Sequence, residues 1–141
     1  MVLRYWIGAD NGSRFVASEE AGCSRLHKEA VVSAGWNDTT RTLVISGRPL
    51  RVKRNEYIAA WEQQESKIKD LTDKGIIPME DDMEEDNDVD FPFPMGVVAA
   101  SIKDVKPARQ IVEDMVMEAV EMMKLGQGYL GGGNGSRDSK L

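Results

Sequence analysis

Apolar and polar positions along this 141-residue chain fall into short blocks that predict strands and helices in turn. Residues 2–7 form a short apolar run that is typical of a buried strand, and a glycine-containing turn at 10–12 closes it. Residues 14–17 are expected to continue as extended chain. Ser18 carries a hydroxyl and precedes two acids, which indicates a helical turn that Gly22 ends.

The next two blocks predict a helix and a strand. Ser24 can cap a helix that runs to about residue 34, and Gly35 fits its C-terminal end. The apolar face predicted for this helix consists of Leu26, Ala30, Val31 and Ala34. Residues 39–46 are rich in β-branched side chains and predict a strand, which a turn at 47–49 closes.

The middle of the chain predicts one long helix over residues 55–73. Asn55 can cap its start and Gly75 can end it. The apolar positions at helical spacing are Tyr57, Ile58, Trp61, Ile68 and Leu71. Pro78 prevents the helix from continuing, and the F-P-F-P sequence at 91–94 predicts an extended linker.

The last apolar blocks predict a short helix at 95–102 and a longer helix from Pro107 to Leu125. The apolar positions of the longer helix are too numerous for one narrow stripe and comprise Ile111, Val112, Met115, Val116, Ala119, Val120, Met122 and Met123. We therefore expect this helix to pack in the core against two neighbours, with a partner-binding methionine face as the alternative. The glycine-rich stretch at 126–138 predicts a flexible tail.

Composition limits the classes of function. The single cysteine excludes an internal disulfide framework. No apolar run approaches the length of a signal-peptide core or a membrane span. The formal net charge is −6, but residues 80–90 hold eight acids and no base, so the acidity is local. Because no basic face is interleaved with aromatic residues, we expect neither nucleic acid nor a membrane as partner.

Several blocks of the sequence resemble, in the same order, the C-terminal part of the fungal nitronate monooxygenases, also called 2-nitropropane dioxygenases. The first block, G-S-R-F-V-A-S-E-E-A-G-C-S-R-L-H-K-E-A-V-V-S-A, spans residues 12–34. The later blocks lie at residues 41–43, 47–52, 55–58, 71–78 and 102–112. The resemblance therefore covers most of residues 12–125.

The resemblance implies an FMN-dependent (β/α)8 barrel that oxidises alkyl nitronates with O2 to carbonyl compounds and nitrite. In that family, a turn at the last barrel strand holds the flavin phosphate through backbone amides, in agreement with the usual phosphate site of such barrels. Glycine frees the backbone in a turn of this kind, and a serine hydroxyl can add a donor. The implied cofactor-binding residues are Asn11, Gly12 and Ser13.

The expected fold class is α/β: a C-terminal fragment of an FMN-binding (β/α)8 TIM barrel with appended helices, helix-rich as an isolated chain. Residues 1–50 are assigned to the remnant of the last barrel strand and the helix and strand after it. Residues 51–125 form a helical C-terminal segment with an acidic loop at 79–94, and residues 126–141 form the flexible tail.

Two departures from the family predict that this chain alone is inactive. A complete barrel takes roughly 250 residues, and the family's catalytic histidine has no counterpart here. The G-A-D sequence at 8–10 also runs almost directly into Asn11, where relatives have several apolar residues. We expect a truncated nitronate monooxygenase-like flavoprotein. The alternative is a non-catalytic remnant or interaction module; a small α/β module with its own function has no motif behind it.

The other candidate residues are better explained by structural roles than by catalysis or metal binding. His27, the only histidine, could act as a base or pair with Cys23 as a nucleophile, but the resemblance places it on an outer barrel helix. The acidic run fails the calcium-loop pattern, because a loop started at Asp82 has Asn87 and Phe93 where glycine and glutamate are needed. We expect a solvated acidic loop and assign no catalytic or metal-ligating residue.

The C-terminal tripeptide predicts a targeting signal. A terminal S-K-L is the address that the peroxisomal import receptor reads, and here it follows a glycine-rich stretch that keeps it accessible. The predicted signal consists of Ser139, Lys140 and Leu141. We expect the import receptor as a partner and the peroxisomal matrix as the location.

Overall fold

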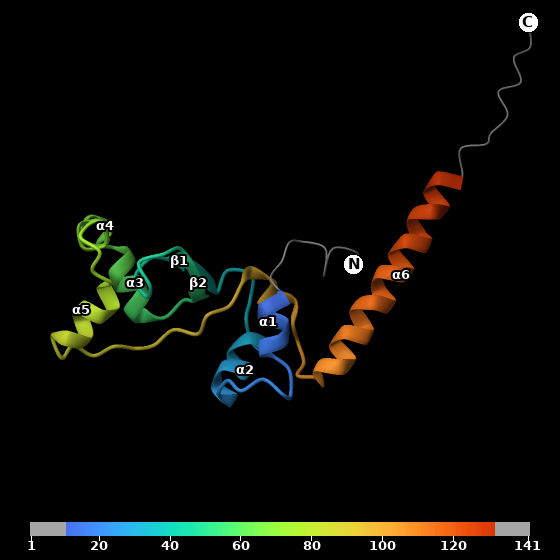
Figure 1. Ribbon diagram of the computed structural model, residues 1–141, viewed down its shortest axis with the longest axis horizontal. Coiled ribbons are helices and arrows are strands. Elements are labelled where there is room, and N and C mark those ends of the chain that lie inside the picture. The colour runs from blue at the N-terminus through green and yellow to red at the C-terminus, as the bar shows by residue number, and fades with distance from the viewer. Residues whose placement is uncertain (1–10, 132–141) are drawn as a thin grey trace, which may run out of the picture.

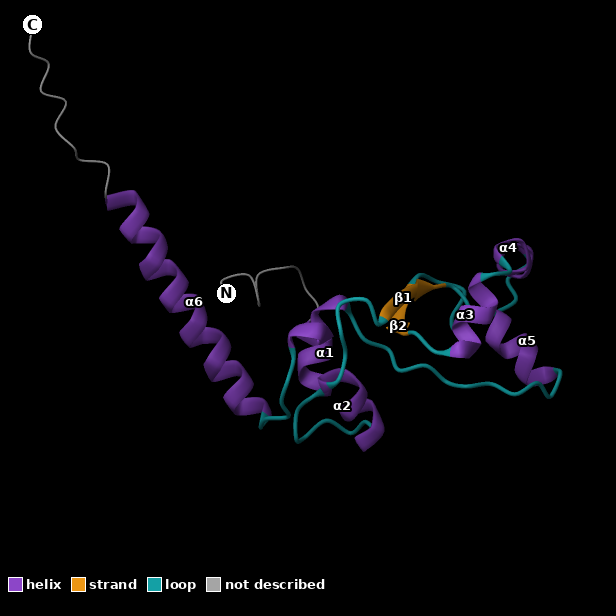
Figure 2. Cartoon of the chain, turned by 180° about the vertical axis from the view of Figure 1, so that it is seen from behind, coloured by secondary structure: helices purple, strands orange, loops and turns teal. Residues whose placement is uncertain are grey.

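Helices dominate this computed structural model, which describes residues 11–131 (Figure 1). The two strands found in that range pair as one antiparallel hairpin, which lies between two groups of helices (Figure 2). The elements run in the order α1 (Asn11–Val16), α2 (Arg25–Val32), β1 (Thr39–Thr42), β2 (Leu50–Lys53), α3 (Glu56–Glu62), α4 (Glu65–Asp73), α5 (Pro78–Glu84), the 3-10 helix η1 (Val97–Ser101) and α6 (Ala108–Gly131). The strand predicted at 2–7 lies outside the described residues.

The segment after the predicted strand is helical, which corrects two expectations. Residues 14–17 are not extended: α1 covers Asn11–Val16, and the Ala17 N–H donates to the Ser13 carbonyl at 3.3 Å. Ser18 starts no helix, because its neighbourhood pairs with the distant Lys106, to whose carbonyl the Glu19 N–H donates at 3.1 Å. This pairing over a long sequence separation overrides the local helix signal.

Helix α2 follows its sequence signals more closely. The Ser24 hydroxyl accepts a hydrogen bond from the His27 N–H, so the predicted cap is confirmed. Of the predicted apolar face, Ala30, Val31 and Ala34 are buried, but Leu26 is 63% exposed. The helix ends at Val32, with Ser33 as its C-cap, rather than at Gly35.

The hairpin joins residues that the sequence analysis treats separately. The strand expected at 39–46 ends at Thr42, whose hydroxyl accepts from the Val44 N–H at 3.1 Å as the chain turns. The return strand β2 was missed, and the two strands pair in the register Thr39↔Lys53, Thr40↔Val52, Arg41↔Arg51, Thr42↔Leu50. Because β2 begins at Leu50, the hairpin spans the division placed between residues 50 and 51.

The extended segment at 91–94 is confirmed, and it pairs along the free edge of β2. The Lys53 N–H donates to the Phe93 carbonyl at 2.8 Å, and the Met95 N–H donates to the Arg51 carbonyl at 3.1 Å. These bonds bring the chain back from α5 to the group formed by α1, α2 and η1. The short helix expected at 95–102 is also present, as η1.

The long helix predicted at 55–73 is two helices. The Asn55 side chain caps α3 by accepting from the Ile58 N–H at 2.9 Å, as predicted. Gln64 leaves the helical region, with φ −115° and ψ 47°, so that α4 changes direction and packs against α3 and α5. Gly75 ends α4 with φ +75°, a conformation that favours glycine.

The acidic loop expected at 79–94 begins as helix α5, which is a correction. Pro78 occupies its first turn, where proline is tolerated, and Glu80 and Asp81 favour the positive end of the helix dipole. Asp82 is only 8% exposed, so the acidic run is not uniformly solvated. Its carboxylate accepts hydrogen bonds from Tyr57 and Trp61.

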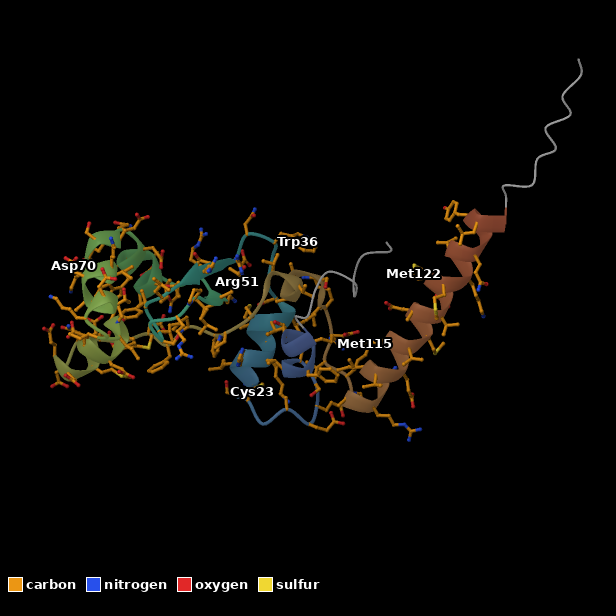
Figure 3. The ribbon with its side chains drawn as sticks, turned by 45° about the horizontal axis from the view of Figure 1, so that its top comes forward. Cys23, Trp36, Arg51, Asp70, Met115 and Met122 are labelled. Atoms are coloured by element: carbon orange, nitrogen blue, oxygen red, sulfur yellow. The ribbon has the colours of Figure 1, made fainter. Side chains whose placement is uncertain are left out.

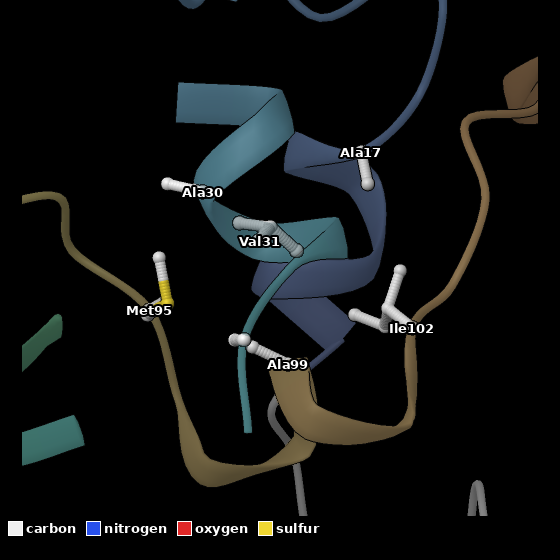
Figure 4. Packing of buried hydrophobic residues seen from close by; sticks show 7 residues of the cluster. Ala17, Ala30, Val31, Met95, Ala99 and Ile102 are labelled. Atoms are coloured by element: carbon white, nitrogen blue, oxygen red, sulfur yellow. The ribbon is translucent and has the colours of Figure 1, made fainter. Parts of the chain in front are cut away.

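Two hydrophobic clusters hold these elements together. The first cluster, drawn in Figure 4, packs α1, α2 and η1 together and comprises Ala17, Ala30, Val31, Ala34, Met95, Ala99 and Ile102. The second joins the hairpin to α3, α4 and α5 and comprises Val44, Val52, Ile58, Trp61, Ile68 and Met79. The first cluster consists largely of small side chains, which lets the backbones of its helices approach closely.

Helix α6 corrects both its predicted end and its predicted packing. It continues through Gly126 to Gly131, so the first part of the predicted tail is helical, while 132–141 lie outside the described residues. Ile111 is buried, but Val116, Met117 and Met123 are about three-fifths exposed. The helix points away from the other described elements, which leaves its apolar face without a neighbour among them (Figure 1). Packing in the core is therefore wrong for the described residues.

Candidate functional site

A surface pocket of about 370 Å³ lies where α1, β2 and the segment before η1 meet. Its lining residues are Gly12, Ser13, Val16, Leu50, Arg51, Pro94, Met95 and Gly96. Two of the three residues predicted to hold a phosphate, Gly12 and Ser13, are among them. The pocket also brings in residues from β2 and the 94–96 segment that the sequence analysis assigned to no site.

The predicted phosphate turn is the first turn of α1 rather than a loop. Asn11 begins the helix, and Gly12 is exposed at the pocket. The first N–H groups of a helix have no partner within the helix itself. Ser13 is buried, and its hydroxyl accepts a hydrogen bond from the Gly96 N–H at 2.8 Å. That bond joins opposite sides of the pocket across a long stretch of sequence.

Arg14 anchors this turn through contacts with Asp104. It is 4% exposed, and its guanidinium donates to the Asp104 carbonyl at 2.8 Å and to the Asp104 carboxylate at 3.0 Å. Lys106 contacts the same carboxylate at 3.4 Å and Asp114 at 2.9 Å. The hydrogen bond with Asp114 holds the pKa of Lys106 above its ordinary value. Burial lowers this pKa by less than that bond raises it, and the charge of Asp104 raises it further. The network ties α1 to the start of α6.

Arg51 brings a positive charge to the pocket (Figure 3). Its Nη1 donates to the Thr39 hydroxyl at 3.2 Å, which orients the guanidinium across the hairpin. Among the residues that the structure describes, no aspartate, glutamate or histidine lines this pocket. Sequence reasoning missed Arg51 because it did not predict β2, although the residue lies in a block that carries the family resemblance.

The family pattern of the nitronate monooxygenases matches residues 5–118, which is most of this chain. The chain belongs to the nitronate monooxygenase family. Two curated relatives, probable nitronate monooxygenases of Staphylococcus saprophyticus and Staphylococcus haemolyticus, are each 36% identical over 63 and 61 residues. Those alignments cover 45% and 43% of this chain but 18% and 17% of the relatives, so the chain spans under a fifth of their length.

Solved structures give a wider match than the curated sequences of the nitronate monooxygenase family. FabK from Thermotoga maritima has a TM-score of 0.64 and a mutant of that protein 0.57, both at 29% identity. Each match covers 83% of this chain, but 38% and 35% of the FabK chains. The predicted fold class, a helix-rich α/β portion of a larger barrel, is confirmed.

The only histidine of this nitronate monooxygenase family member has a structural role. His27 Nε2 lies 2.8 Å from the Pro94 carbonyl, which accepts from the ring N–H, and the ring stacks on Phe93 at 5.1 Å. Cys23 instead directs its sulfur to the Val16 carbonyl at 3.5 Å. The two side chains are therefore not brought together as a nucleophilic pair, and His27 supports the wall of the pocket.

A second polar cluster lies away from the pocket, between α3 and α5. Asp82 accepts from the Tyr57 hydroxyl and from Trp61 Nε1, both at 2.7 Å, and from Asn87 Nδ2 at 3.1 Å. Burial raises the pKa of Asp82, but these hydrogen bonds outweigh it and hold that pKa below its ordinary value. Burial and the bond to Asp82 raise the pKa of Tyr57, which keeps its proton. Each polar atom has a partner, so the cluster is structural.

Two further searches concern only residues 11–131. In that range, no three His, Cys, Asp or Glu side chains are grouped so that they could hold a metal ion. None of the helices found there combines the length and the apolar character that crossing a bilayer requires. The predicted targeting residues Ser139, Lys140 and Leu141 lie outside this range.

Proposed function

We propose that this chain carries the phosphate-binding part of an FMN-dependent nitronate monooxygenase. The observation that carries the proposal is the pocket that joins Gly12 and Ser13 to Gly96 and Arg51, in a chain whose family acts on nitronates. Bound FMN would supply the two-electron chemistry that oxidises an alkyl nitronate with O2 to a carbonyl compound and nitrite. The residues of this chain would bind and orient its phosphate.

The residues of the pocket fit an anionic phosphate group. Gly12 brings no side chain into the pocket, and Arg51 adds a cation without a competing acid among the described lining residues. Ser13 has a structural role in addition to the expected phosphate contact, because its hydroxyl accepts a hydrogen bond from the Gly96 N–H. It holds the two backbone segments of the pocket together.

Chemistry on the substrate is not assigned to this pocket. Within residues 11–131, no carboxylate or imidazole lines the pocket to remove a proton, and His27 is not one of the lining residues. We propose that the chain lacks the catalytic base and is inactive alone. The exposed apolar face of α6 favours a second candidate function, a non-catalytic module that docks onto a partner.

Retention of flavin tests the proposed function. The purified chain is incubated with FMN, desalted and examined for the flavin absorbance band near ~450 nm. We expect a retained band, with no nitrite released from a nitroalkane nitronate. A folded chain without retained FMN would contradict flavin binding and favour the docking module. Nitrite release at a rate above that of free FMN would contradict the missing base.

We further propose that Ser139, Lys140 and Leu141 direct the chain to the peroxisomal matrix through the import receptor. A fluorescent protein fused to the N-terminus should overlap with catalase in fixed cells. Removing the last three residues should leave the fluorescence spread through the cytosol. Equal distributions of the two fusions would overturn the proposed address.

A further inference from the structure

Two arginines face each other across the hairpin. The register places Arg41 directly opposite Arg51, so both side chains lie on the same face of the two strands. Like charges directly opposite each other destabilise a strand pair. Among the residues that the structure describes, neither guanidinium forms an ion pair, and Arg51 has only the hydrogen bond to Thr39. The donors that the two guanidinium groups keep are able to bind an anion.

The residues around Arg51 indicate where such an anion would bind. Arg51 is half-buried and lines the pocket that also contains Gly12 and Gly96, two residues without side chains. One guanidinium nitrogen is committed to Thr39, which restricts the side chain, and the other N–H donors of the fork keep their capacity for an oxygen ligand. A planar fork of this kind matches a phosphate better than an ammonium group does.

We propose that Arg51 is the residue that binds the phosphate of the flavin nucleotide and thereby makes the pocket select FMN over riboflavin. This inference rests on the proposed function, because it takes the pocket to be the flavin-phosphate site. Arg41, on the same strand face, strengthens the positive potential there and contributes less, because it is exposed and does not line the pocket. Arg51 is a binding residue and takes no part in proton transfer.

The test compares two flavins that differ only in the phosphate. Dissociation constants for FMN and riboflavin are measured with the full chain by quenching of flavin fluorescence, for wild type, Arg51→Gln and Arg51→Lys. We expect Arg51→Gln to weaken FMN binding about tenfold while riboflavin changes less than about twofold, since a hydrogen bond to a charged group is worth about that much. Arg51→Lys should keep part of the preference, because it keeps the charge without the fork.

Arg109→Gln is the matched control, since it makes the same change at a side chain that is 88% exposed on α6. It should leave both constants unchanged, and inorganic phosphate should compete with FMN but not with riboflavin. An Arg51→Gln variant that kept the wild-type ratio of the two constants would overturn the role of Arg51 alone. A wild-type chain that bound neither flavin would overturn the proposed function, and this inference with it. Far-ultraviolet circular dichroism confirms that each variant is folded.

Discussion

Replacing Asp82 with alanine is expected to lower the free energy of unfolding by about 2–4 kcal/mol. Its carboxylate accepts from the Tyr57 hydroxyl, from Trp61 Nε1 and from Asn87 Nδ2. Trp61 is buried in the cluster of α3, α4 and α5, so alanine leaves its N–H without an acceptor. Asp82 also joins α3 to α5 through these bonds, and the variant loses that link.

Urea unfolding followed by tryptophan fluorescence measures this loss. Asp88→Ala is the matched control, because Asp88 belongs to the same acidic run and is exposed. It should change the stability by less than about 0.5 kcal/mol. Equal losses in the two variants would contradict the structural role of Asp82.

The stabilising role of Asp82 can also be tested by measuring the free energy of unfolding as a function of pH. The folded-state pKa of Asp82 is held below its ordinary value, so the carboxylate stabilises the fold fully above the unfolded pKa of about 3.9. That stability is lost as the pH falls through the lowered folded-state pKa. Asp82→Asn cannot titrate, so its unfolding free energy should depend less on pH in the acid range than that of wild type.

The elements that could be predicted from the sequence are those whose signals are satisfied locally. Ser24 and Asn55 cap helices through N–H groups three residues away, and Gly75 ends α4 through its own backbone conformation. Pro78 occupies the first turn of α5 for a similarly local reason. None of these positions needs a partner that is distant in the sequence.

The elements that were not predicted correctly depend on partners that are distant in the sequence. Ser18 pairs with Lys106, and the chain turns after Thr42 so that β2 can pair with β1. The pocket has the same property: the Ser13–Gly96 bond spans 83 residues, and no local pattern indicates it. The sequence could therefore point to Gly12 and Ser13 through a family resemblance, but not to Arg51, which reaches the pocket only through the hairpin.

Helix α6 shows a different limit of prediction from the sequence. Its apolar periodicity predicts that one face avoids water, and the structure has a helix there. Periodicity carries no information on what covers that face. Met117 and Met123 are exposed in the described residues, so the partner-binding face that the sequence left as an alternative stays a prediction.

The second large effect is expected at Arg14, the residue that anchors the first turn of α1. Arg14→Ala should lower the free energy of unfolding by about 2–4 kcal/mol, since it removes charge-assisted bonds of a buried guanidinium and leaves a cavity. The loss is expected to be smaller than for a fully buried pair, because the Asp104 side chain is 52% exposed and stays solvated without its partner. Because α1 forms one wall of the pocket, retained FMN should fall as well.

Thermal unfolding by circular dichroism measures the stability of this variant, and absorbance after desalting measures its flavin. Arg25→Ala is the control, since Arg25 is 87% exposed and pairs only with Glu29 on the surface of α2. It should change stability by a few tenths of a kcal/mol at most. Arg14→Lys should recover part of the stability, because the ammonium reaches one oxygen of Asp104 but cannot bind two at once. If Arg14→Ala were as stable as Arg25→Ala, the pocket would be held by the Ser13–Gly96 bond rather than by the contact with Asp104.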